Sequence, residues 1–115
     1  MPYLQVNTNQ SVTDELSQQL LQELSAVVVK STGKPERYVM VQVNSGQTMC
    51  FGGSTAPLAY LECKSIGLSP LQAKALSAVL SEVLMTQLSL NADRIYIEFS
   101  NCPGEYWGWN KSTFA

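Results

Sequence analysis

The sequence predicts an α+β protein, an α/β sandwich in which two β-α-β repeats form a four-stranded sheet with both helices on one face. Two observations support this prediction. Short segments alternate apolar and polar residues, as in half-buried strands, and two longer segments repeat apolar residues every three or four positions, as in amphipathic helices. The order strand, helix, strand also occurs twice at one constant offset, with Tyr3 against Tyr60 and Tyr38 against Ile95.

The first repeat opens with a strand over residues 2–7, whose residues alternate in character. Ser11 and Asp14 have the spacing of a capping box, which predicts the start of the first helix. Gly33 and then Pro35 predict its end, and alternating valines predict a strand over residues 39–43. The apolar face of this helix is expected to comprise Leu16, Leu20, Leu21, Leu24, Val27 and Val28.

The second repeat follows a structured connection over residues 47–57 and opens with a strand over residues 58–66. Ser69, Pro70 and Gln72 form a strong helix start, with a serine cap and proline in the first turn. A fourth strand over residues 94–99 places Tyr96 and Glu98 on one face and three apolar residues on the other. The second helix is expected to bury Leu71, Ala75, Leu76, Val79, Leu80, Val83, Leu84 and Leu88.

Right-handed crossovers make each repeat a parallel strand pair with its helix on one face of the sheet. Two repeats side by side leave the opposite sheet face without a covering layer. Where such a face carries apolar residues it must be buried, and since the chain offers no third layer, we expect it to be buried by assembly with copies of the same chain.

The composition excludes several classes of function. The 115 residues suggest one domain, residues 1–115, and the net charge of −2 without runs of Lys or Arg argues against nucleic acid. No apolar run approaches a membrane span, and no secretory signal opens the chain, so we expect a cytoplasmic protein, with non-classical secretion left open. There is no histidine, which removes Ser-His and Cys-His nucleophile systems and most zinc sites.

The remaining motifs indicate neither a cofactor nor a redox centre. The three cysteines, Cys50, Cys63 and Cys102, form no Cys-x-x-Cys pair, which is typical of reduced thiols. The run from Phe51 to Gly53 lacks the spacing and the lysine of a phosphate loop. We therefore expect no metal and no cofactor.

Pro2 is the candidate with chemistry of its own. Removal of Met1 would leave a free secondary amine, and burial beside cations would favour its neutral form. A neutral amine can act as a general base or a nucleophile. The alternative is a proline that simply opens an edge strand, where a missing N–H costs nothing.

The sequence resembles the macrophage migration inhibitory factor family of the tautomerase superfamily, from end to end. The resemblance rests on Pro2 together with these runs: Val6 to Asn9, Thr32 to Pro35, Phe51 to Ser54, Ser65 to Gly67, Asp93 to Ile97, and Gly108 to Ala115. It implies a homotrimer of β-α-β repeats with pockets shared between neighbouring subunits. It also implies keto–enol tautomerisation of phenylpyruvate-like or p-hydroxyphenylpyruvate-like enols, with aromatic enolpyruvates as substrates.

The resemblance also assigns site residues. Pro2 matches the catalytic base, Lys34 the lysine that binds the substrate carboxylate, and Ile66 a position whose backbone N–H faces the same carboxylate. Lys34 has an alternative role as a solvated lysine that favours a helix C-terminus. Tyr96 matches a tyrosine contributed by the adjacent subunit, and the pocket wall and rim match Tyr38, Trp109 and Phe114, for which plain packing is the alternative.

Three positions depart from the better-known vertebrate members. Glu98 replaces asparagine, Lys64 replaces histidine and Trp107 replaces valine at the pocket. Glu98 would repel a substrate carboxylate and stabilise protonated Pro2, so a slow tautomerase is expected. The thiol oxidoreductase activity of the family does not carry over, because its Cys-x-x-Cys run is absent. Two alternatives stay open: a cytokine-like trimeric binding or signalling module with a vestigial pocket, and a trimeric scaffold for an unknown small ligand.

Overall fold

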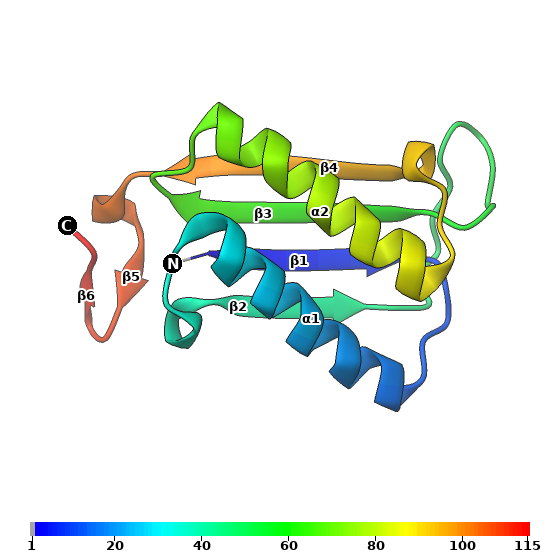
Figure 1. Ribbon diagram of the computed structural model, residues 1–115, viewed down its shortest axis with the longest axis horizontal. Helices are drawn as coiled ribbons and strands as arrows, with labels where there is room; N and C mark the ends of the chain where they lie inside the picture. Colours follow the sequence, from blue (N-terminus) through cyan, green and yellow to red (C-terminus); the bar gives the residue numbers. More distant parts are fainter. Residues whose placement is uncertain (1) are drawn as a thin grey trace.

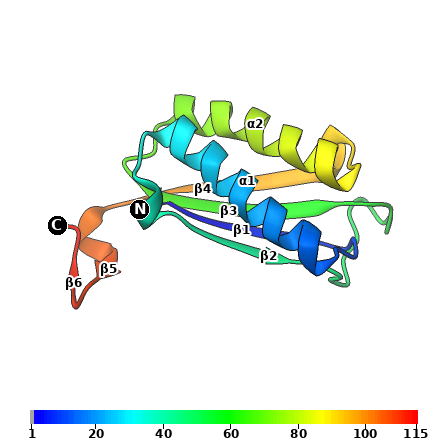
Figure 2. The same ribbon diagram turned by 60° about the horizontal axis from the view of Figure 1, so that its bottom comes forward.

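Two helices pack on one face of a four-stranded sheet in the computed structural model, which describes residues 2–115 (Figures 1 and 2). The expected removal of Met1 lies outside the described residues. The strands are β1 (Tyr3–Thr8), β2 (Met40–Asn44), β3 (Ala59–Ile66) and β4 (Ile95–Cys102), and the helices are α1 (Asp14–Thr32) and α2 (Pro70–Leu88).

The strand order in the sheet is β2-β1-β3-β4. β1 pairs with β2 in parallel and β3 pairs with β4 in parallel, while the central pair β1 and β3 is antiparallel. Each helix therefore connects two parallel neighbours, as a β-α-β crossover requires. The predicted α+β architecture of two repeats is confirmed.

A C-terminal hairpin, which the sequence analysis did not predict, follows β4. β5 (Gly108–Trp109) and β6 (Ser112–Thr113) pair antiparallel, apart from the main sheet. The chain before it passes through a 3-10 turn at Gly104–Tyr106, and a Cβ on Gly104 would lie 2.8 Å from the carbonyl oxygen of Phe114. Glycine is thus needed where the chain end folds back.

The caps define where the helices begin and end. The Ser69 hydroxyl accepts from the Gln72 N–H at 3.1 Å and the Gln72 side chain accepts from the Ser69 N–H at 3.0 Å, which confirms the predicted capping box of α2. Gly33 ends α1 in the left-handed region, as predicted. The prediction of a box at Ser11 was wrong, because Thr13 caps α1 and accepts from the Leu16 N–H at 3.2 Å.

The core lies between the helices and the sheet. α1 contributes Leu20, Leu24 and Val28, and α2 contributes Leu76, Leu80, Val83, Leu84 and Leu88. The expected burial of Leu71, Ala75 and Val79 was wrong: all three are exposed, Leu71 by 79% and Val79 by 38%. Ala75 and Val79 directly precede the buried Leu76 and Leu80, and Leu71 stands one place before the same row extended back to the first turn. One residue turns the side chain about 100° around the helix, so all three point away from the core. None of the helices in residues 2–115 is long and apolar enough to cross a membrane.

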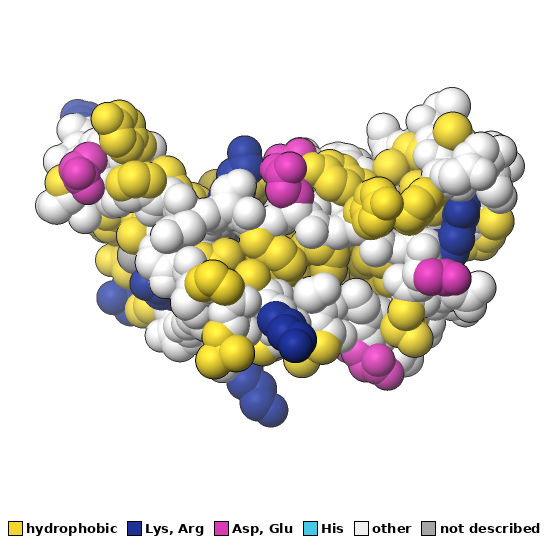
Figure 3. All heavy atoms as spheres, turned by 90° about the horizontal axis from the view of Figure 1, so that it is seen from above, with side chains coloured by type: hydrophobic (Ala, Val, Ile, Leu, Met, Phe, Trp, Pro, Cys, Tyr) yellow, Lys and Arg dark blue, Asp and Glu magenta, His cyan; other side chains and the backbone are white. Residues whose placement is uncertain are grey.

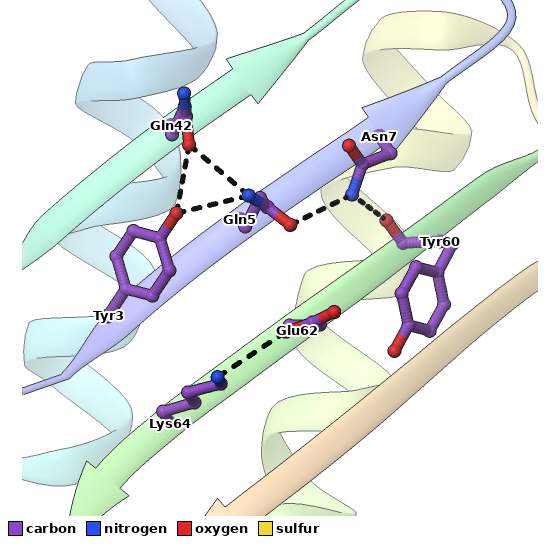
Figure 4. A network of polar contacts seen from close by, with 7 residues as sticks. All are labelled: Tyr3, Gln5, Asn7, Gln42, Tyr60, Glu62 and Lys64. Carbon is purple, nitrogen blue, oxygen red and sulfur yellow. Dashed lines mark hydrogen bonds and ion pairs between the residues drawn. The ribbon is translucent and has the colours of Figure 1, made fainter. Parts of the chain in front are cut away.

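The sheet face opposite the helices is mostly polar, with Gln5, Gln42 and Glu62 among its side chains. A side-chain network crosses it (Figure 4). The Tyr3 hydroxyl donates to Gln42 Oε1 at 2.9 Å, and Gln5 Nε2 donates to the Tyr3 hydroxyl oxygen and to Gln42 Oε1, each at 3.3 Å. Asn7 Nδ2 continues the network to Gln5 Oε1 at 3.2 Å. Burial of apolar area on this face is therefore not the argument for assembly.

Candidate functional site

Pro2 lies at the entrance to β1, and its side chain is fully buried. Its carbonyl oxygen accepts a 3.0 Å hydrogen bond from the Met40 N–H, which ties the chain start to β2. A cavity of about 230 Å³ lies beside it. The cavity is lined by Pro2, Arg37, Tyr38, Val39, Met40, Trp107, Gly108, Trp109 and Phe114.

Three aromatic rings form one wall of this cavity. The ring of Tyr38 meets Trp109 and Phe114 edge to face, with centroids 5.3 and 5.7 Å apart, while Trp109 and Phe114 stack at 5.5 Å. The Phe114 N–H donates to the carbonyl oxygens of Gly104 and Trp107, each at 3.2 Å. These bonds hold the end of the chain against the cavity, so the residues that the sequence singled out at Tyr38, Trp109 and Phe114 lie together with Pro2.

Two of the expected carboxylate contacts do not line this cavity. Lys34 lies half-buried just after α1, and it precedes the 3-10 turn Glu36–Tyr38 that does reach the cavity. Ile66 is the last residue of β3, where it pairs with Cys102 of β4. Both residues belong to the same end of the sheet as Pro2, because β1 begins where β3 and β4 end.

Tyr96 and Glu98 lie on the open face of β4, Tyr96 toward the other end of the sheet and Glu98 near the middle of the strand. The register places Tyr96 opposite Tyr60, which is itself opposite Asn7. Asn7 is five residues beyond Pro2, so at about 3.3 Å per residue Tyr96 is displaced by roughly 16 Å along the strands. The Tyr96 ring is 64% exposed and packs on Phe51, with centroids 4.4 Å apart. Neither Tyr96 nor Glu98 lines the Pro2 cavity of its own chain.

The charges of the open face are arranged around β3. Lys64 Nζ lies 3.6 Å from Glu62 Oε1, and this contact is the single ion pair within residues 2–115. Glu98 stands directly opposite Glu62 on the neighbouring strand. Partial desolvation, followed by the negative charges of Glu62 and Glu98, raises the pKa of Tyr60 above its usual value.

A larger cavity, of about 560 Å³, adjoins the Pro2 cavity on the side of Lys64, and Trp107 and Gly108 line both. Seen from above, the molecule is hollowed along one side between two raised ends (Figure 3). The hairpin of β5 and β6 forms the end on the left of this view, where it lies in Figure 1. Trp107, which stands where the resemblance has valine, therefore lines both cavities.

The cysteines are free and dispersed. Cys63 is buried on the helix side of β3, and this burial raises the pKa of its thiol to about 11. Cys50 is exposed and Cys102 is half-buried. Between residues 2 and 115, no cluster of three or more Cys, Asp or Glu side chains could hold a metal ion.

Sequence reasoning missed Arg37, which also lines the Pro2 cavity. Its guanidinium lies over the Tyr38 ring, with Cζ 4.8 Å from the centroid. Arg37 is the middle residue of a three-residue 3-10 turn, which has no periodicity that a sequence could reveal. Its nearness in sequence to Lys34 and Tyr38 was the only available signal.

The fold and the site together define a class of small α+β proteins in which a buried proline at the start of the chain faces an aromatic cavity. The family model for macrophage migration inhibitory factor matches residues 1–115. The chain belongs to the macrophage migration inhibitory factor family.

Individual relatives resemble the chain over its full length. It is 38% identical to the macrophage migration inhibitory factor of Xenopus tropicalis and 39% identical to the homolog of Brugia malayi, with 100% of both chains covered in each case. The crystal structure of the homologue from Prochlorococcus marinus matches with a TM-score of 0.93 and 38% identity, over 98% of this chain and 99% of that one. The Trichinella spiralis structure matches with a TM-score of 0.88 and 37% identity, over 97% and 99%.

Proposed function

We propose that this protein is a slow keto–enol tautomerase for phenylpyruvate-like and p-hydroxyphenylpyruvate-like enols, with Pro2 as its base. The observation that carries this proposal is the buried Pro2 beside a cavity walled by aromatic rings. It is supported by family membership over the whole chain.

Removal of Met1 turns the Pro2 nitrogen from an amide into a secondary amine. Burial disfavours the protonated form of such an amine, which leaves it free to accept a proton near neutral pH. The amine takes the enol hydroxyl proton and returns a proton to the carbon next to the carbonyl, so one group serves both ends. Tyr38, Trp109 and Phe114 hold the substrate ring, while Lys34 and the backbone N–H of Ile66 bind its carboxylate.

We further propose that the working form is a homotrimer in which Tyr96 and Glu98 reach the Pro2 cavity of a neighbouring copy. Within one chain Tyr96 is displaced from Pro2 by roughly 16 Å and Glu98 by roughly 10 Å along the strands, and neither lines the Pro2 cavity, so we place both at a Pro2 site only from another copy. Tyr96 is 64% exposed, which leaves its ring available for such a contact. Sedimentation equilibrium tests the assembly, and a stable monomer at micromolar concentration would remove both residues from the site.

The test of the chemistry pairs mass spectrometry of the intact N-terminus with a phenylenolpyruvate assay. We expect a chain without Met1, and we expect Pro2→Ala to lower turnover by about 100- to 10,000-fold, the usual range for a general base. Circular dichroism checks that the variant keeps its fold. Equal turnover by wild type and Pro2→Ala would show that proline is not the base.

The alternative is a cytokine-like binding or signalling module whose pocket is vestigial. The relatives from Xenopus tropicalis and Brugia malayi are named as a macrophage migration inhibitory factor and its homolog, which favours this candidate. A macrophage migration assay with wild type and Pro2→Ala separates the two. Activity in that assay, unchanged by Pro2→Ala and without measurable turnover, would support the binding module over the enzyme.

A further inference from the structure

Arg37 places a fixed positive charge at the aromatic wall of the Pro2 cavity. Its guanidinium carbon lies 4.8 Å from the centroid of the Tyr38 ring, and that ring in turn contacts Trp109 and Phe114. A guanidinium over an aromatic face is held there by the quadrupole of the ring. The charged group is therefore oriented by the same wall that would hold a substrate ring.

The charge of Arg37 is not neutralised by a carboxylate of the described chain. The one acid in its turn, Glu36, faces α1 instead, where its Oε2 accepts a 3.0 Å hydrogen bond from the Ser25 hydroxyl. The ion pair within residues 2–115 is remote from the turn, since it joins Lys64 to Glu62 on the open sheet face. Within residues 2–115 this exposed guanidinium at the cavity has no carboxylate partner, so within one chain it can bind an anion.

We propose that Arg37 binds a second anionic group on the substrate, so that the site selects aromatic enol acids that carry a carboxylate on the ring. The inference rests on the proposed function for the reaction itself. Lys34 is outside the cavity lining and serves the carboxylate next to the enol, whereas Arg37 lies at the wall that faces the ring. A guanidinium suits a carboxylate because its two parallel N–H groups match the two oxygens.

Paired substrates test this assignment. Turnover of the enols of phenylpyruvate and 4-carboxyphenylpyruvate is compared in wild type, Arg37→Gln, Arg37→Lys and Lys74→Gln, the last an exposed lysine of α2 that serves as the control. Wild type should favour the diacid. Arg37→Gln should lower kcat/KM for the diacid by about 10- to 100-fold, mainly through KM, since a charged hydrogen-bond pair is lost. Phenylpyruvate should lose less kcat/KM than the diacid in Arg37→Gln, Lys74→Gln should match wild type with both, and Arg37→Lys should recover part of the loss.

A binding measurement makes the test independent of turnover. Isothermal titration calorimetry with 3-phenylpropionate and 3-(4-carboxyphenyl)propionate, which cannot tautomerise, should show the same Arg37-dependent preference for the diacid. If Pro2→Ala remains active but this preference holds, the proposed function fails and the Arg37 assignment stands. An equal loss for both acids in Arg37→Gln, or no preference in wild type, overturns the assignment.

Discussion

The guanidinium of Arg94 lies over the ring of Phe51, with Cζ 5.1 Å from the ring centroid, and donates a 2.7 Å hydrogen bond to the Phe51 carbonyl oxygen. The ring of Tyr96 also packs on Phe51, with ring centroids 4.4 Å apart. Arg94 also donates to the carbonyl oxygens of Ser54, Ala56 and Pro57. One side chain thus ties the loop before β3 to the start of β4.

We expect Arg94→Ala to lower the free energy of unfolding by about 1 to 3 kcal/mol, because several charge-assisted hydrogen bonds to backbone carbonyls are lost and water replaces them only in part. Urea unfolding measures the change. Lys74→Ala is the control, since Lys74 is an exposed residue of α2, and a surface substitution of this kind usually alters stability by less than about 0.5 kcal/mol. Equal effects of the two variants would show that the Arg94 bonds contribute little.

The start of α1 provides a second prediction. Thr13→Ala should destabilise the protein by about 1 kcal/mol, because the Thr13 hydroxyl accepts from the Leu16 N–H at the helix start. Ser11→Ala should have almost no effect, since Ser11 is exposed and lies outside the cap. Thermal unfolding of both variants decides between the two residues, and a larger loss for Ser11→Ala would contradict the cap assignment.

The thiols provide a third prediction. Burial raises the pKa of Cys63 to about 11, so at pH 8 only about one molecule in a thousand carries the reactive thiolate. Exposed Cys50 should therefore react with Ellman's reagent first, and Cys63 only when the protein unfolds. Reduction of insulin with dithiol should not be catalysed, because Cys50, Cys63 and Cys102 form no Cys-x-x-Cys pair. Clear catalysis in that assay would contradict this view of the thiols.

Periodicity and cap residues were enough to predict the main fold. The alternation in four strands, the cap at Ser69 and the glycine at Gly33 are local signals, and each one reports on its own stretch of chain. Burial on α2 was less predictable, because Leu71 and Leu76 are equally apolar and only packing decides which one faces the sheet. The short β5–β6 hairpin gave no strand signal, as two-residue strands have no period to detect.

The candidate site was predictable only in part. The resemblance named Pro2, Tyr38, Trp109 and Phe114, which the fold brings together at one end of the sheet. Arg37 was missed because its place depends on the 3-10 turn that carries it over the Tyr38 ring. The polar character of the open face could be read from alternate residues of β1 and β3, since Gln5 and Asn7 share a face with Glu62 and Lys64.

The position of Glu98 refines the expectation of a slow enzyme. Glu98 faces Glu62 across the parallel pair of β3 and β4, while the Lys64 ammonium pairs with Glu62 at 3.6 Å. The charge of Glu98 is felt locally, since it contributes to the raised pKa of Tyr60.

Glu98→Asn should first lower the pKa of Tyr60. The negative charge of Glu98 disfavours the tyrosinate, so its removal shifts titration of the Tyr60 phenol toward lower pH. Carbon NMR of labelled tyrosine measures this shift, with Tyr60→Phe to assign the signal. Glu105→Gln is the matched control, because Glu105 is exposed in the 3-10 turn after β4 and is not among the charges that raise the pKa of Tyr60.

If the proposed trimer forms, the same substitution should raise kcat/KM for phenylenolpyruvate and move the pH–rate profile to lower pH. A carboxylate near the Pro2 of a neighbouring copy stabilises the protonated amine and so raises the pKa of the base, and it also repels the substrate carboxylate. Removing it reverses both effects, by about 1 kcal/mol for a unit charge at 4 Å in water. Superimposable pH–rate profiles, together with a shifted Tyr60 pKa, would mean that the Glu98 carboxylate acts on its own sheet face and does not reach a Pro2 site. A lower rate in the variant would mean that Glu98 takes part in the proton transfer.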